Sequence, residues 1–69
     1  MNPVPEYKVQ VIWSEEDRAF IARCPDFPGV SAFSESAAQA LAEAHVALRL
    51  AVATYQDEGW PLPEPQPAG

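Results

Sequence analysis

One long amphipathic segment constrains the fold of this chain more than any other feature. It extends from Ala37 to about Glu58, nearly a third of the 69 residues, and is dominated by the strong helix formers Ala, Leu, Glu and Gln. Ser36 with Gln39 fits an N-terminal capping box, and Gly59 stands where a left-handed C-cap is expected. Apolar residues three or four positions apart form a single stripe: Ala37, Leu41, Ala44, Leu48, Val52 and Tyr55. We therefore expect a helix that buries this stripe against a second layer.

The residues before the helix alternate between apolar and polar side chains, as strands do. Tyr7–Trp13 and Arg18–Cys24 both show this period of two, and the polar turn Ser14–Asp17 between them favours an antiparallel hairpin. The prolines of Pro25–Gly29 lack the N–H donor that a strand ladder needs, so we expect a turn there. Val30–Phe33 is then predicted to be a third strand.

These elements predict a two-layer α+β fold, in which a three-stranded antiparallel sheet is covered on one face by the helix. Proline at every second position from Pro61 to Pro67 removes the donors of one edge, so this tail could add a short edge segment in a β-β-β-α-β order. The alternative is a polyproline-like tail with only Trp60 and Leu62 docked, which we favour beyond Glu64. We expect a single domain over residues 1–69, with a core from about 7 to 62 and an extended or flexible tail from 63 to 69.

Charge narrows the possible partners. The formal net charge is −6, and the four basic residues are scattered, whereas contacts to nucleic-acid phosphates need clustered Lys and Arg. We therefore expect no direct nucleic-acid partner, and the excess of carboxylates would instead speed encounter with a basic protein. The chain has no signal-peptide pattern and no apolar run of the roughly 20 residues that cross a bilayer. We expect a cytoplasmic protein with no membrane partner.

The residues offer little chemistry for catalysis. Cys24 and His45 are the only cysteine and histidine, and nucleophilic catalysis needs a third group that orients the base. Cys24 ends an apolar strand face and is predicted to be a small buried hydrophobe, and His45 lies at the border of the helix stripe. No phosphate-binding glycine loop or metal-ligand motif occurs. We therefore predict no catalytic, cofactor or metal site, and a small hydrolase ranks last among the functions considered.

Two features predict association with other chains. Val46 and Leu50 lie one turn apart on the helix face opposite the stripe and could form a contact patch. A three-stranded meander also has two open edges, of which the tail can cover only one. We therefore expect a homo-oligomer, either a dimer or a tetramer, with Val46 and Leu50 as candidate contacts.

An ordered set of short motifs resembles a known family. The motifs are Tyr7-Lys8-Val9 with Trp13–Asp17, Phe20–Arg23, Cys24–Gly29, Ser36–Leu41 and Gly59–Pro65. No single motif is specific. The Pro-Asp-Phe-Pro-Gly turn after a strand, followed by a capped helix and a Gly-x-Pro-x-Pro-Glu-Pro exit, is hard to produce by chance. From about Tyr7 to Pro65, the chain resembles the HicB-like antitoxins of type II toxin–antitoxin systems in their short single-domain form.

The resemblance implies a partial ribonuclease-H-like fold without nuclease activity. It also implies that the protein binds and neutralises a small basic HicA-type toxin, a ribonuclease that cleaves mRNA. Many relatives carry a C-terminal DNA-binding domain, whereas this chain ends at Gly69, so we expect no direct contact with its own operon. Arg18 stands where relatives often have glycine in the hairpin turn.

The negative net charge and the implied basic partner together suggest toxin-facing carboxylates. The candidates are Glu15, Glu16, Asp17, Asp57 and Glu58. Each acid taken singly could equally be a solvated surface group, since exposed ion pairs contribute only about 0–1 kcal/mol. The alternative function is an orphan oligomeric domain, regulatory or scaffolding, without a toxin partner.

Overall fold

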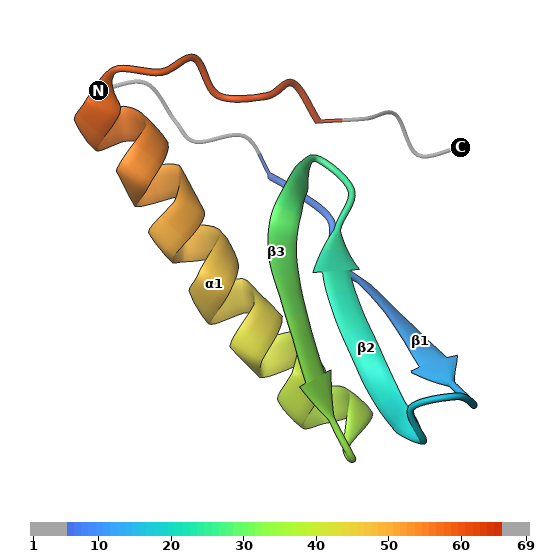
Figure 1. Ribbon diagram of the computed structural model, residues 1–69. Coiled ribbons are helices and arrows are strands. Elements are labelled where there is room, and N and C mark those ends of the chain that lie inside the picture. The colour runs from blue at the N-terminus through green and yellow to red at the C-terminus, as the bar shows by residue number, and fades with distance from the viewer. Residues whose placement is uncertain (1–5, 66–69) are drawn as a thin grey trace.

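The computed structural model describes residues 6–65 of the chain. Within these residues, the elements follow the order β1 (Gln10–Ser14), β2 (Ala19–Cys24), β3 (Phe27–Ser34) and α1 (Ala37–Glu58). The strands form an antiparallel meander in the order β1-β2-β3, and α1 covers one face of this sheet (Figure 1). The predicted two-layer α+β fold is confirmed for the described part of the chain. The helix is not long and apolar enough to cross a membrane.

β1 begins later than the alternation predicted. Gln10 pairs with Arg23 and β2 ends at Cys24, so the residues before Val9 extend past the end of β2. Tyr7 instead turns into the core, and its hydroxyl donates a hydrogen bond of 2.5 Å to the carbonyl of Pro63. The alternating pattern correctly places Tyr7, Val9 and Val11 on the core side, whereas Trp13, at the far end of the same series, is 46% exposed. Strand pairing stops where the partner strand ends.

The start of β3 corrects a prediction. Phe27, Pro28 and Gly29 belong to β3, and only Pro25 and Asp26 form the turn after β2. The register is irregular here, because Arg23 pairs with Ser31 whereas Cys24 pairs with Phe27, so β3 carries extra residues opposite this step. The expected turn over Pro25–Gly29 is therefore confirmed at Pro25 and Asp26 but wrong for Phe27–Gly29, because an edge strand tolerates proline where the ladder is interrupted.

The core lies between α1 and the covered face of the sheet. α1 buries every fourth residue of one stripe, namely Ala40, Ala44, Leu48 and Val52. The two alanines pack against Ala22 of β2, where small side chains let the helix approach the strand closely. Leu48 and Val52 join a larger cluster formed with Tyr7, Cys24, Phe27 and Val30. The predicted stripe is confirmed at its centre, while Ala37, Leu41 and Tyr55 are half-buried at its border.

Both ends of α1 have the expected capping residues, but only the Ser36 half of the predicted capping box is formed, because the Ser36 N–H bonds to Ser34 rather than to Gln39. The hydroxyl of Ser36 accepts a hydrogen bond of 3.3 Å from the backbone N–H of Gln39, which satisfies one of the free donors of the first turn. The N–H of Ser36 itself donates to the hydroxyl of Ser34 at 3.2 Å. Gly59 adopts a φ of 73° and ends the helix with N–H bonds to the last turn. These caps explain why the boundaries of α1 match the sequence pattern.

The described part of the tail corrects the expected fourth strand. No strand occurs among residues 60–65, so the described part of the tail agrees with the alternative expectation of a proline-rich segment in which Trp60 and Leu62 are docked. Leu62 packs against the larger core cluster, and the ring of Trp60 meets that of Tyr55 edge-on at 5.4 Å. Residues 66–69 of the expected flexible tail lie outside the described residues.

Candidate protein-interaction surface

The face of the sheet that α1 does not cover carries an apolar row. Ile12 of β1 lies opposite Ile21 of β2, and Ile21 lies opposite Phe33 of β3, so the three side chains cross the sheet side by side. Ile12 and Phe33 are 45% and 57% exposed, and Ile21 is half-buried between them. We call these three residues the outer row. A contiguous exposed apolar patch of this kind is typical of a surface that meets another protein.

Polar side chains flank the outer row on the same face. Gln10, Arg23 and Ser31 form the neighbouring cross-strand row, and all three are exposed. On the other side of the outer row lie Ser14 and Ala19, next to the β1–β2 turn. An apolar centre bordered by polar groups is the usual anatomy of a protein–protein interface.

The β1–β2 turn carries three of the predicted contact residues. Glu15, Glu16 and Asp17 are all exposed, and the turn begins within three residues of Ile12 in the outer row. Two of these carboxylates are held in place: the Glu15 carboxylate accepts a hydrogen bond of 2.6 Å from the indole Nε1 of Trp13, and that of Asp17 accepts one of 3.0 Å from Ser14 Oγ. We call Glu15, Glu16 and Asp17 the acidic hairpin.

The other two predicted contact residues lie elsewhere. Asp57 and Glu58 are exposed in the last turn of α1, at the opposite end of the molecule from the acidic hairpin (Figure 1). The structure therefore does not bring the five carboxylates together on one surface. Carboxylates at a helix C-terminus also face the negative end of the helix dipole, and the last turn of α1 holds no basic residue. This placement costs some stability rather than providing it.

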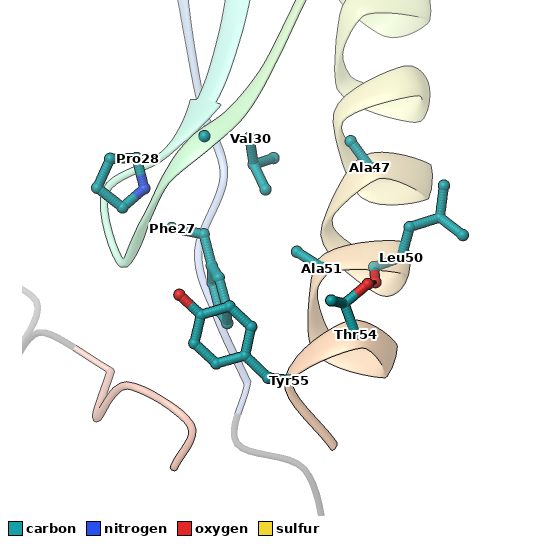
Figure 2. Close-up of a pocket in the computed structure, with 9 residues that line it drawn as sticks. Phe27, Pro28, Val30, Ala47, Leu50, Ala51, Thr54 and Tyr55 are labelled. Atoms are coloured by element: carbon teal, nitrogen blue, oxygen red, sulfur yellow. Dashed lines mark hydrogen bonds between the residues drawn. The ribbon is translucent and has the colours of Figure 1, made fainter. Parts of the chain in front are cut away.

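A shallow groove runs between α1 and β3 on the helix side of the molecule. Its volume is about 320 Å³, and it is lined by Phe27, Pro28, Gly29, Val30, Ala47, Leu50, Ala51, Thr54 and Tyr55. Ala47 and Ala51 face β3 across the groove, whereas Leu50 points away from the strand (Figure 2). We call this feature the α1–β3 groove. The candidate oligomer contacts Val46 and Leu50 are 48% and 64% exposed, and Leu50 stands at the rim of the groove.

The candidate catalytic groups do not meet. Cys24 is buried in the larger core cluster, whereas His45 is exposed on α1 beside a separate depression of about 500 Å³ near Tyr7. Cys24 borders a different pocket, between Arg23 and Pro28. Among residues 6–65, no cluster of three His, Cys, Asp or Glu side chains could hold a metal ion. Every buried side-chain nitrogen or oxygen in this range has a hydrogen-bond partner.

The sequence pattern did not reveal the outer row. Ile12 follows Lys8 and Gln10 at the polar positions of the alternation, and Ile21 stands between two residues that face the core. An apolar residue at a solvent position is a weak signal by itself, because scattered surface apolars are common. Three such residues in one row would have indicated an apolar patch, but recognising the row requires the register of all three strands.

A comparison with protein families gives a match that includes all of the described residues. Residues 6–69 match the family described as the HicB_like antitoxin of bacterial toxin–antitoxin systems. The match includes the strands, α1 and the proline-rich tail, so it spans both the outer row and the acidic hairpin. No curated protein and no solved structure gives a match.

Proposed function

The chain belongs to the HicB-like antitoxin family of bacterial toxin–antitoxin systems, and on that premise we propose that it binds and neutralises a small basic HicA-type toxin that cleaves mRNA. The family match over residues 6–69 is the observation that carries this proposal. We further propose that the protein acts without catalysis, in the cytoplasm where the mRNA substrate of such a toxin is found. The separation of buried Cys24 from exposed His45 supports a role in binding rather than in bond cleavage.

The outer row and the acidic hairpin are the proposed toxin-binding surface. An RNA-cleaving toxin must present basic residues to the phosphates of its substrate. Glu15, Glu16 and Asp17 would face these residues, so that the antitoxin covers the surface to which RNA would otherwise bind. Ile12 and Phe33, which are exposed before binding, would be removed from water in the centre of the contact.

The hairpin suits this role because its carboxylates are already positioned. The bonds from Trp13 to Glu15 and from Ser14 to Asp17 fix two of the three side chains before any partner arrives. A pre-ordered side chain loses less conformational entropy on binding. Asp57 and Glu58 are too far from the acidic hairpin to belong to the same contact area. They therefore rank second as proposed toxin contacts.

Co-expression with the neighbouring gene is the first test. The gene beside an antitoxin is expected to encode a short basic protein with one histidine. A tagged form of the present chain should retain that protein in a pull-down and should abolish its cleavage of RNA at equimolar concentration. Full RNA cleavage in the presence of excess antitoxin would contradict the proposed function.

A pair of charge reversals locates the contact. Glu15→Lys with Glu16→Lys should lower the association rate with the toxin by about 10-fold at low salt, because the local attraction becomes repulsion. Asp57→Lys with Glu58→Lys is the matched control, since both double variants have a net charge of −2 instead of −6. A larger effect of the second pair would place the toxin at the end of α1, and no effect of either would reject a role for these carboxylates.

A substitution in the outer row tests the apolar part of the surface. Phe33→Lys should raise the Kd for the toxin by at least about 10-fold, because a lysine ammonium group would have to be desolvated in the contact. Phe33 is more than half exposed, so the fold should tolerate the change. Val46→Lys, which adds the same charge on α1, should leave the Kd within about 2-fold of the original value. Equal effects of the two variants would reject the outer row as the toxin site.

The alternative function is an orphan oligomeric domain without a toxin. The open edge of β3 and the uncharged α1–β3 groove favour contacts between copies, which such a domain would need. The absence of a small basic open reading frame beside the gene would support this alternative. The presence of one whose product binds the chain would reject it.

A further inference from the structure

The depression beside His45 lies between α1 and the segment that precedes β1, and its volume is about 500 Å³. We call it the Tyr7 groove. We propose that it binds a small aliphatic monocarboxylate, with the carboxylate at His45 and Arg49 and the hydrocarbon chain on the apolar floor. This inference goes beyond the proposed antitoxin function and does not rest on it. Three observations carry it: the side chains at the rim, the composition of the floor, and the distribution of charge.

The first observation is that the rim carries two hydrogen-bond donors one helical turn apart. His45 and Arg49 are four positions apart on α1, so their side chains lie on one side of the helix, and both line the groove. Both are exposed, and among residues 6–65 neither side chain makes a hydrogen bond or an ion pair. A guanidinium group can hold a carboxylate by two parallel hydrogen bonds, and an imidazole N–H beside it can donate a third. The rim is therefore suited to a single carboxylate.

The second observation is the apolar floor. Leu48 and Val52 belong to the larger core cluster and line the groove together with Tyr7. Tyr7 is held in place by its hydrogen bond to the carbonyl of Pro63 and by the edge-on contact of its ring with Phe27, at 4.8 Å between centroids. The floor is thus fixed by the core before a ligand arrives, and the volume lies within the roughly 300–1,000 Å³ of ordinary small-molecule sites. A hydrocarbon chain on this floor would be removed from water.

The third observation is the distribution of charge. Arg49 is the only Lys or Arg of α1, and Glu6 is the only residue that brings a carboxylate into the lining of the groove. The net charge of −6 repels anions at long range, which disfavours ligands with several negative charges, such as nucleotides. A single carboxylate has the least long-range repulsion to overcome and still gains the short contact with Arg49. The charges therefore favour a monocarboxylate over a polyanion.

Octanoate is the probe, and octanamide is the matched ligand with the same chain and no charge. Proton–nitrogen correlation NMR of the full chain should show shifts of the residues that line the groove, with a Kd for octanoate of about 0.1–1 mM, as is reasonable for so small a ligand. Octanamide should bind at least about 5-fold more weakly, because it cannot form charge-assisted bonds with Arg49. The proposal would be overturned by equal affinities of the two ligands, or by the absence of shifts up to about 10 mM octanoate.

A charge-matched pair of substitutions tests the rim. Arg49→Gln should raise the Kd for octanoate by at least about 5-fold, because the guanidinium group is lost. Arg18→Gln, in the β1–β2 turn, is the control, since both variants change the net charge from −6 to −7. The control should keep the Kd within about 2-fold of the original value. Equal effects of the two variants would mean that overall charge governs binding, and would overturn the assignment of the carboxylate to Arg49.

Glu6 provides a test with the opposite sign. Glu6→Gln should lower the Kd for octanoate by about 2-fold or more, because Glu6 lines the groove and repels a bound carboxylate. Glu16→Gln makes the same change of net charge in the acidic hairpin and should have a smaller effect. Equal effects of the two variants would contradict a carboxylate bound in this groove.

Filling the groove tests its location. Ala53 lines the groove and is exposed, so the fold should tolerate Ala53→Trp, which circular dichroism can verify. The indole ring would occupy the floor, and octanoate binding should be lost. Unchanged binding in a folded Ala53→Trp variant would place octanoate elsewhere and overturn the proposal.

The outer row variant separates this proposal from the toxin-binding proposal. Phe33 lies on the face of the sheet that α1 does not cover, so Phe33→Lys should impair toxin binding and keep the octanoate Kd within about 2-fold. Arg49→Gln should do the reverse. Loss of octanoate binding in Phe33→Lys, with normal binding in Arg49→Gln, would mean that the hydrocarbon chain binds to the outer row and would overturn the Tyr7 groove as its site.

Discussion

Arg18 carries the backbone strain of the β1–β2 turn. Its φ of 52° lies in the left-handed region, and it is the only non-glycine residue with a positive φ among residues 6–65. This conformation costs a residue with a Cβ roughly 1–2 kcal/mol, whereas glycine adopts it freely. Glycine also gains entropy in the unfolded chain, which offsets about 0.4–1 kcal/mol of the relief.

We therefore expect Arg18→Gly to raise the free energy of unfolding by about 0.5–1 kcal/mol. Urea unfolding followed by circular dichroism measures the change. Arg18→Ala removes the same charge but keeps a Cβ, so it should leave the stability almost unchanged. If the two variants were equally stable, backbone strain at Arg18 would not be the cause.

Tyr7 links stability to alkaline pH. Burial raises the pKa of its hydroxyl above the ordinary value of 10.0, and unfavourable electrostatic interactions with Asp26 and Cys24 add to this shift. The folded state thus favours the neutral hydroxyl, which also donates its proton to the carbonyl of Pro63. A native pKa above the unfolded one stabilises the protein below about pH 10, and this contribution is lost as the pH rises through the native pKa.

Tyr7→Phe keeps the ring but removes both the titration and the hydrogen bond. At pH 7 it should lower the free energy of unfolding by about 0.5–1.5 kcal/mol, the usual net contribution of one hydrogen bond. The difference between the two proteins should shrink as the pH increases above 10, which chemical unfolding at a series of pH values can measure. A difference that stays constant up to pH 12 would show that the hydroxyl does not titrate with folding.

At the level of elements, α1 carries charges that oppose its own dipole. Its first turn has no acidic residue, its last turn has no basic residue, and Asp57 and Glu58 stand at the C-terminal end. Asp57→Asn and Glu58→Gln should each raise the free energy of unfolding by about 0.3–1 kcal/mol at low salt. Glu43→Gln, in the middle of the exposed side of the helix, is the control and should have little effect. Thermal unfolding at low and high salt measures all three, and equal shifts would contradict a dipole effect.

The elements differ in how far local sequence determines them. α1 was predicted with its bounds because its periodicity, its Ser36 cap and its Gly59 terminus are all local signals. β1 and β3 were predicted to exist, but their starting residues were not. β1 starts where β2 provides a partner, and β3 includes Pro28 because the ladder is interrupted there. Both boundaries depend on pairing between strands, which residues within one strand do not encode.

The candidate surfaces show the same division. The acidic hairpin was predicted as a turn because three consecutive acids between two alternating segments are visible in the sequence. The outer row was missed because its residues come from three strands, and only their register places Ile12, Ile21 and Phe33 side by side. The sequence also did not predict that the acidic hairpin and the end of α1 lie at opposite ends of the molecule, because this depends on how α1 is oriented on the sheet (Figure 1).

For the whole molecule, two candidate interaction surfaces lie on different sides of the sheet. The outer row faces away from α1, whereas the α1–β3 groove lies beside the helix at one edge. The acidic hairpin lies at one end of the outer row, and Gln10, Arg23 and Ser31 border its other side, whereas no residue that lines the groove is charged. The two surfaces could therefore be occupied at the same time.

The position of the acidic hairpin predicts that toxin binding depends on salt. Raising sodium chloride from about 0.02 to 0.5 M shortens the Debye length severalfold, so it weakens the attraction between exposed charges of opposite sign. The Kd for a basic toxin should therefore rise by about 10-fold or more. Titration calorimetry measures this constant. Glu15→Lys with Glu16→Lys, at a net charge of −2, should make the Kd less sensitive to salt, because the carboxylates beside the outer row have been replaced. If the Kd of the original chain did not change with salt, attraction between carboxylates and a basic toxin would not contribute to binding, and the acidic hairpin could not be part of the contact.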